Sequence, residues 1–115
     1  MPAGLITVAE TPLFVRQAEK VWSDAARQEF VSYIAGNPVG GDVIPDTGGV
    51  RKIRCSREGA GKRGGARVIY FYANPSRPLY LLMVYAKARK EDLSADEKRA
   101  LRNLAAALKG RTPAK

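Results

Sequence analysis

The chain has 115 residues, 45% of them hydrophobic, and a formal net charge of +9 at neutral pH. This length and composition fit one folded domain and exclude a disordered chain. No apolar run approaches the roughly 20 residues of a membrane-spanning helix, and we expect no signal peptide. The single cysteine, Cys55, excludes an internal disulfide, so we expect a reducing cytoplasm as the compartment.

Positive charge is concentrated in the second part of the sequence. Residues 1–50 carry a net charge of −3, whereas residues 51–115 carry a net charge of +12. This asymmetry favours a polyanionic partner. Nucleic acid is the first candidate and an acidic protein the second. A membrane surface is the third, because no basic amphipathic helix with large apolar anchors is present.

The first forty residues predict a strand followed by two helices. Residues 5–10 form a short β-branched run typical of a strand. Thr11 is an N-cap candidate for the first helix, and its apolar residues share one face: Phe14, Ala18, Val21 and Trp22. Ser23 is the N-cap candidate for the second helix, whose apolar residues also repeat at helical spacing: Ala26, Phe30, Tyr33 and Ile34.

The remaining residues predict a three-stranded meander and a last helix. Residues 40–49 are rich in turn formers and predict a loop. Strand-like runs follow at 50–56, 66–74 and 78–87, joined by short loops. Ser94 and Glu97 then form a capping-box pattern, and the apolar stripe of the last helix is Leu101, Leu104, Ala105 and Leu108.

This order of elements predicts an α+β fold. We expect a mostly antiparallel sheet of about four strands, with the two N-terminal helices packed on one face and a C-terminal helix. We expect residues 1–110 to form a single domain and residues 111–115 a frayed tail.

The strongest functional signal is a run of cations between residues 51 and 67. It holds seven basic residues against one carboxylate: Arg51, Lys52, Arg54, Arg57, Lys62, Arg63 and Arg67. Strand alternation puts Lys52 and Arg54 on one face, and Met83, Tyr85 and Lys87 on one face of the last strand. An ordinary solvated face would explain some of these cations. Like charges on adjacent strands cost stability, however, so the pattern favours a phosphate-binding surface with aromatic residues to stack bases.

The sequence offers no cofactor or metal motif. Residues 59–64 contain a GxGxxG pattern, but a strand follows it where a dinucleotide site needs a helix. The chain has no histidine and no ligand cluster with metal spacing. RNA, however, carries its own nucleophile, since the 2′-hydroxyl can attack the adjacent phosphate when the growing charge is neutralised. A lysine among cations can accept a proton and an arginine can clamp the phosphate, so a metal-free ribonuclease is chemically reasonable.

Three segments resemble the RelE/HigB family of type II toxin–antitoxin toxins, in particular its HigB-like branch: GDVIPDTGGVRKIR (41–54), GKRGGARVIYFY (61–72) and VYAKARKEDLSADEKRAL (84–101). The resemblance runs from about residue 7 to residue 108. It implies a RelE-like fold and an mRNA interferase, an endoribonuclease that inhibits translation by cleaving messages on the ribosome without metal or cofactor. It also implies a helix-turn-helix, HigA-like antitoxin, with operator DNA bound only through the complex.

The resemblance further implies catalytic roles. Lys52 is the general base or a phosphate ligand, Arg54 and Arg67 stabilise the transition state, and Lys87 positions or protonates the leaving group. Further RNA contacts are expected from Arg51, Arg57, Lys62, Arg63, Tyr85 and Lys90. RelE has a tyrosine after its last basic residue, and the corresponding residue here is Leu93. The proton donor therefore stays open among Lys87, Lys90 and Lys62.

Two other functions also fit the sequence. ParE-type toxins share the fold and inhibit DNA gyrase without cleaving RNA, although cations on three strands favour cleavage. A noncatalytic RNA- or ribosome-binding module is the third possibility. The sequence leaves open the codon preference, the ribosome dependence, the antitoxin-binding surface and the oligomeric state.

Overall fold

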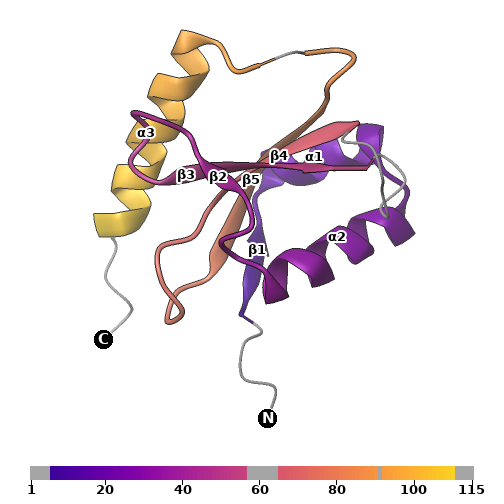
Figure 1. Cartoon of the computed structure of the whole chain (residues 1–115), viewed down its shortest axis with the longest axis horizontal. Coiled ribbons are helices and arrows are strands. Elements are labelled where there is room, and N and C mark those ends of the chain that lie inside the picture. The colour runs from indigo at the N-terminus through magenta and orange to yellow at the C-terminus, as the bar shows by residue number, and fades with distance from the viewer. Residues whose placement is uncertain (1–5, 57–64, 91, 111–115) are drawn as a thin grey trace.

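A computed structural model of the chain describes residues 6–56, 65–90 and 92–110. These residues form three helices and five strands in the order β1 (Val8–Glu10), α1 (Pro12–Val21), α2 (Asp24–Gly36), β2 (Asp42–Val43), β3 (Val50–Cys55), β4 (Ala66–Phe71), β5 (Leu79–Ala86) and α3 (Ala95–Gly110). The strands make one sheet in the order β1-β5-β4-β3-β2. Helices α1 and α2 pack on one face, and α3 packs on the other (Figure 1).

The predicted α+β fold is confirmed, and the sheet has one strand more than the sequence predicts. The extra strand, β2, lies within the expected loop over residues 40–49 and pairs antiparallel with β3. The sheet is mixed because β1 runs parallel to β5, with Val8 opposite Leu79. The expected tail at 111–115 lies outside the described residues, as does the whole GxGxxG pattern at residues 59–64.

The face under α1 and α2 carries the first hydrophobic core. Both predicted N-caps form, since the side chains of Thr11 and Ser23 accept hydrogen bonds from the backbone N–H groups of Phe14 and Ala26. Trp22 stacks on Phe30 with ring centroids 5.3 Å apart, and its indole N–H donates to the Ser56 carbonyl at 2.9 Å. This bond ties the end of β3 to the turn between the helices.

The second core lies between α3 and one end of the opposite face. The predicted capping box forms, with Ser94 and Glu97 exchanging hydrogen bonds of 2.8 and 3.1 Å. Ile69 pairs with Met83 but Tyr70 pairs with Leu81, so Leu82 is an extra residue in β5. Leu82 and Met83 therefore both face α3. None of the three helices in the described ranges combines the length and the apolarity needed to cross a membrane.

Helix α3 covers only one end of the sheet face on which it packs and leaves the other end of that face uncovered. Along β3, Val50 is fully buried in the α3 core, Lys52 is half-buried and Arg54 is exposed. The three residues share this face because side chains alternate along a strand. Lys52 and Arg54 thus lie on the open part of this face of the sheet.

Strand β2 is held in place by close backbone contacts around Gly41. The Gly41 N–H donates to the Tyr70 hydroxyl at 2.8 Å, and that hydroxyl donates to the Pro38 carbonyl at 2.9 Å. Burial raises the pKa of Tyr70, which keeps the phenol protonated as a donor. A Cβ at Gly41 would lie 2.9 Å from the carbonyl oxygen of Lys52 and 2.9 Å from two Tyr70 atoms.

We predict that Gly41→Ala lowers the free energy of unfolding by about 1–3 kcal/mol, because the added methyl group overpacks this contact. Urea denaturation measures the change. Gly110→Ala is the matched control, since a Cβ there meets nothing within 4 Å. It should leave stability unchanged or raise it slightly. Equal effects of the two substitutions would contradict the prediction.

Candidate functional site

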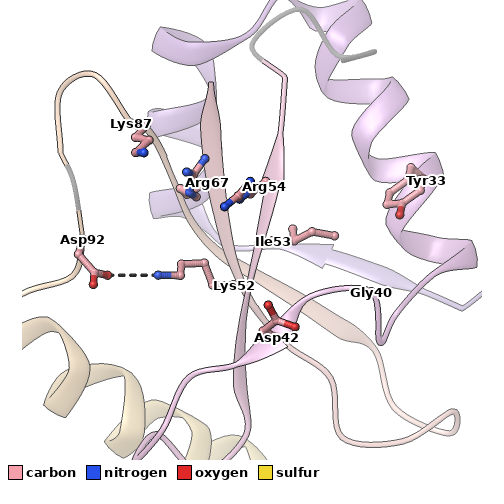
Figure 2. Close-up of a pocket in the computed structure, with 9 residues that line it drawn as sticks. All are labelled: Tyr33, Gly40, Asp42, Lys52, Ile53, Arg54, Arg67, Lys87 and Asp92. Atoms are coloured by element: carbon pink, nitrogen blue, oxygen red, sulfur yellow. Dashed lines mark hydrogen bonds and ion pairs between the residues drawn. The ribbon is translucent and has the colours of Figure 1, made fainter. Parts of the chain in front are cut away.

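Four cations line one pocket at the open end of the α3-side face. Lys52 and Arg54 come from β3, Arg67 from β4, and Lys87 from the turn directly after β5. The pocket has a volume of about 660 Å³, and its other lining residues are Tyr33, Gly40, Asp42, Ile53 and Asp92 (Figure 2). The structure therefore brings together all four residues that the sequence predicts to be catalytic.

The antiparallel register explains this convergence. Arg54 lies directly opposite Arg67, and Arg67 lies opposite Tyr85 on the next strand. Residues opposite each other in such a pair have neighbouring side chains on the same face. Two guanidinium groups in this position repel each other, and an anion bound between them would offset that repulsion.

The two arginines differ in burial. Arg67 is 8% exposed and donates from Nη1 to the Ala66 carbonyl at 3.2 Å, whereas Arg54 is exposed. A charge removed from water is screened less, so Arg67 acts on a bound anion more strongly than a surface arginine does. In Figure 2 the two arginines lie between Lys52 and Lys87.

Two carboxylates share the pocket with the four cations. Asp92 lies 3.3 Å from the Lys52 ammonium and also accepts a 2.7 Å hydrogen bond from the Leu93 N–H. The Leu93 bond, aided by Lys52, holds the pKa of Asp92 below its usual range. Asp42 is the cross-strand partner of Lys52. A phosphate that binds Lys52 must therefore compete with an ionised carboxylate.

The predicted further RNA contacts do not line this pocket where the structure describes them. Arg51 points to the opposite face and donates to the Gly41 carbonyl at 2.7 Å, so it holds β2. Lys90 pairs with Glu97 at 2.8 Å. Arg57, Lys62 and Arg63 lie outside the described residues.

Tyr85, another predicted RNA contact, is buried, so its ring is not available to stack on a base at the surface. It is 7% exposed, and within the described part of the chain its hydroxyl has no hydrogen-bond partner. Burial, together with the charge of Asp92, raises the pKa of Tyr85. Leu93, which the resemblance places at the position of the RelE tyrosine, is also 7% exposed and packs in the same α3 core.

The pocket also contains residues that the sequence did not predict as functional. Tyr33, Gly40 and Asp42 line it, although the spacing along α2 predicts Tyr33 on the buried stripe. Tyr33 is instead 51% exposed. The sequence feature that could have indicated these lining residues is the glycine pair at 40 and 41, because glycine lets the backbone pass close to neighbouring side chains.

Metal-binding residues do not cluster in the described ranges, which contain no group of three or more His, Cys, Asp or Glu residues placed to hold an ion. The donors that the pocket presents are instead ammonium and guanidinium groups. These groups bind phosphate and stabilise negative charge that develops on it.

Comparison with known proteins gives a family and a fold. Residues 7–115 match the family described as the RelE toxin of the RelE/RelB toxin–antitoxin system. The chain is also similar to a solved structure of E. coli toxin RelE, a double arginine-to-alanine mutant in the free state. The TM-score is 0.55 at 11% sequence identity, with 76% of this chain and 88% of that chain covered. This structural likeness supports a shared fold.

We predict that the Cys55 thiol reacts slowly in the folded protein. Burial raises the pKa of Cys55 to about 12, and the charge of Arg67 opposes that rise only in part. Because the thiolate is the reactive form, alkylation by iodoacetamide at pH 8 should be at least ~100-fold slower than in urea-unfolded protein. Mass spectrometry of this single cysteine measures both rates, and similar rates would contradict the prediction.

We predict that Asp92→Asn tightens binding of a polyanion to the pocket. The asparagine oxygen can still accept the Leu93 N–H, while the competitor for Lys52 loses its charge. We expect affinity for a noncleavable 2′-O-methyl oligoribonucleotide to rise roughly two- to fivefold, as for a surface ion pair, and the gain to shrink with added salt. Fluorescence anisotropy measures the affinity.

The control for this substitution is Asp96→Asn, which removes the same charge from α3 outside the pocket. Asp96 is 87% exposed and pairs with Arg99. It should change the affinity less than Asp92→Asn. If both substitutions raise the affinity equally, overall charge and not the Lys52 pair is responsible.

Proposed function

Because this chain belongs to the RelE toxin family, and so is the toxin of a toxin–antitoxin pair, we propose that it is an endoribonuclease that cleaves mRNA. The observation that carries the proposal is the convergence of Lys52, Arg54, Arg67 and Lys87 on one pocket. A phosphodiester gains negative charge as it is attacked, and fixed cations around it lower the barrier.

The proposed reaction needs no metal. The 2′-hydroxyl oxygen forms a bond to the adjacent phosphorus while its proton passes to a base. The bond from phosphorus to the 5′-oxygen breaks as that oxygen takes up a proton. The products are a 2′,3′-cyclic phosphate and a 5′-hydroxyl end, so atoms and charge balance without an external reactant.

The two arginines are the proposed ligands of the transition state. Their guanidinium groups present several N–H donors in a fixed plane, which suits the equatorial oxygens of a pentavalent phosphate. Arg67 is fixed on β4 and buried, so it changes little between free and bound states. Arg54, directly opposite, supplies donors from the solvent side.

The two lysines are the proposed proton-transfer and positioning groups. Once RNA replaces Asp92 beside Lys52, this lysine acts as a phosphate ligand in its ammonium form or as the general base in its neutral amine form. Lys87 positions or protonates the leaving 5′-oxygen. Its backbone N–H donates to the Gly65 carbonyl at 3.0 Å, which fixes the turn that carries it.

The family implies an antitoxin partner. We propose that this antitoxin is a helix-turn-helix, HigA-like protein, that operator DNA binds only to the toxin–antitoxin complex, and that the substrate is mRNA on the ribosome in the cytoplasm. The support is the resemblance of residues 41–54, 61–72 and 84–101 to the HigB-like branch, together with the net charge of +9.

We predict that Arg54→Ala and Arg67→Ala each lower cleavage about 10²- to 10³-fold, as removal of one transition-state donor does in other enzymes. The protein is induced in cells and the 5′ ends of translated messages are mapped. Arg54 is exposed, so its substitution tests the site without disturbing the core. Arg67 is buried, so the Tm of its variant is compared with that of the wild type.

Arg16→Ala is the control, because Arg16 is an exposed cation of α1 outside the pocket. It should cleave as the wild type does. New ends within codons that disappear in the pocket variants support the proposal. Gyrase-linked DNA breaks without new RNA ends would overturn it in favour of a ParE-type toxin. RNA binding without cleavage would leave a noncatalytic binding module.

A further inference from the structure

The pocket has a second end, which the proposed catalytic roles do not use. Lys52, Arg54, Arg67 and Lys87 lie on one side of Ile53 in Figure 2, and Tyr33 projects from α2 on the other side. The second end is thus formed by a tyrosine and an isoleucine. It adjoins the cations within one continuous cavity.

Tyr33 is unusual among the large side chains of α2. Its helical neighbours Phe30 and Ile34 are 3% and 0% exposed, while Tyr33 itself is 51% exposed. It lies in the last turns of the helix, where the chain turns through residues 37–40 toward β2. An aromatic ring left this exposed has a face available for a ligand.

Gly40 keeps the space beside this ring open. A Cβ built on Gly40 would lie 3.5 Å from the Ile53 side chain and 3.7 Å from the Tyr33 hydroxyl. A larger side chain at this position would therefore fill the gap between the two. The glycine thus leaves space between the Tyr33 hydroxyl, at the edge of the ring, and the aliphatic side chain of Ile53.

Charge assigns the two ends to different parts of a nucleotide. The four cations attract phosphate, whereas the second end has no cation among its lining residues Tyr33, Gly40 and Ile53. Asp42, which also lines the pocket, disfavours phosphate near β2. The volume of about 660 Å³ lies within the roughly 300–1,000 Å³ typical of small-ligand sites.

We propose that Tyr33 is a base-stacking residue of this pocket. Its ring takes the base of a nucleotide adjoining the cleaved bond, while the phosphate lies among the four cations. The inference rests on the proposed function and deepens it. It also provides the aromatic contact that Tyr85 cannot offer because it is only 7% exposed, and that Leu93 cannot offer because it is aliphatic.

The test is a double-mutant cycle that removes the Tyr33 ring, the RNA base, or both. Cleavage of an mRNA in a reconstituted translation reaction is measured for the wild type, Tyr33→Ala and Tyr33→Phe. The same message is also prepared with an abasic nucleotide on either side of the cleaved bond. Since Tyr33 is half-exposed, both variants should fold, and their Tm values verify this.

We expect Tyr33→Ala to lower kcat/KM roughly 5- to 150-fold, the range for loss of one base–aromatic stack. Tyr33→Phe should stay within about twofold of the wild type, because the ring is retained. On one of the two abasic messages the wild type and Tyr33→Ala should become equal, since the base and the ring act as a pair. Leu13→Ala is the control, an apolar α1 residue of similar exposure at 41%.

Two outcomes would overturn the inference. One is wild-type cleavage by Tyr33→Ala, or a loss that persists on both abasic messages. The other is weaker binding of the cognate antitoxin with unchanged RNA kinetics, which would make the ring a protein contact. Binding of a noncleavable 2′-O-methyl oligonucleotide is measured in parallel. Binding that depends on Tyr33 without any cleavage would keep the stacking role and reject the nuclease, so the two failures are distinguishable.

Discussion

The cross-strand pair of Arg54 and Arg67 is the constraint on which the site depends. Two guanidinium groups side by side on a sheet repel each other, and the register of β3 and β4 allows them no other arrangement. The same register places Val50 opposite Phe71 in the α3 core, so the cations and the core belong to one face. Any slip by one residue would move the charges to the face under α1 and α2 and expose the apolar residues. The α3 core therefore keeps the cations together in the pocket, because the register that buries its residues is the one that aligns the arginines.

The opposite face holds the strands in that position. Trp22 binds the backbone at the end of β3, and Tyr70 links β4 to the segment before β2 through Pro38 and Gly41. Beyond the part of β5 that pairs with β1, the Val84 N–H donates to the side-chain oxygen of Gln17 at 3.0 Å. Each contact joins a helix or a loop to a strand that carries a cation, or to its neighbour. A site that stabilises charge works best when its groups are already placed before the substrate binds, and strands fixed by such contacts meet that requirement.

Local patterns in the sequence were enough to predict much of this arrangement. The N-caps, the capping box and the three strands of the meander follow from neighbouring residues, and strand alternation alone puts Lys52 and Arg54 on one face. Long-range features could not be predicted in this way. The parallel pairing of β1 with β5 joins residues about seventy positions apart, and β2 lies among turn-forming residues. The extra residue Leu82 changes the phase of β5 without a glycine or proline to mark it. Periodicity also predicts Tyr33 to be buried, although it is 51% exposed, because periodicity gives the apolar face of a helix and not which turns of that face are covered.

Among the lysines considered as proton donors for the proposed reaction, Lys87 is the one that the geometry favours. A donor must reach the leaving oxygen in the pocket. Leu93, which the resemblance places at the position of the RelE tyrosine, packs against α3, and the Tyr85 hydroxyl is buried in the same core. Lys90 is held by Glu97, while Lys62 lies outside the described residues. Lys87 is exposed and lines the pocket directly after β5. Burial of Leu93 and Tyr85 fixes both ends of the segment from β5 to α3 that begins with Lys87. These two buried side chains therefore anchor the segment that carries the proposed proton donor.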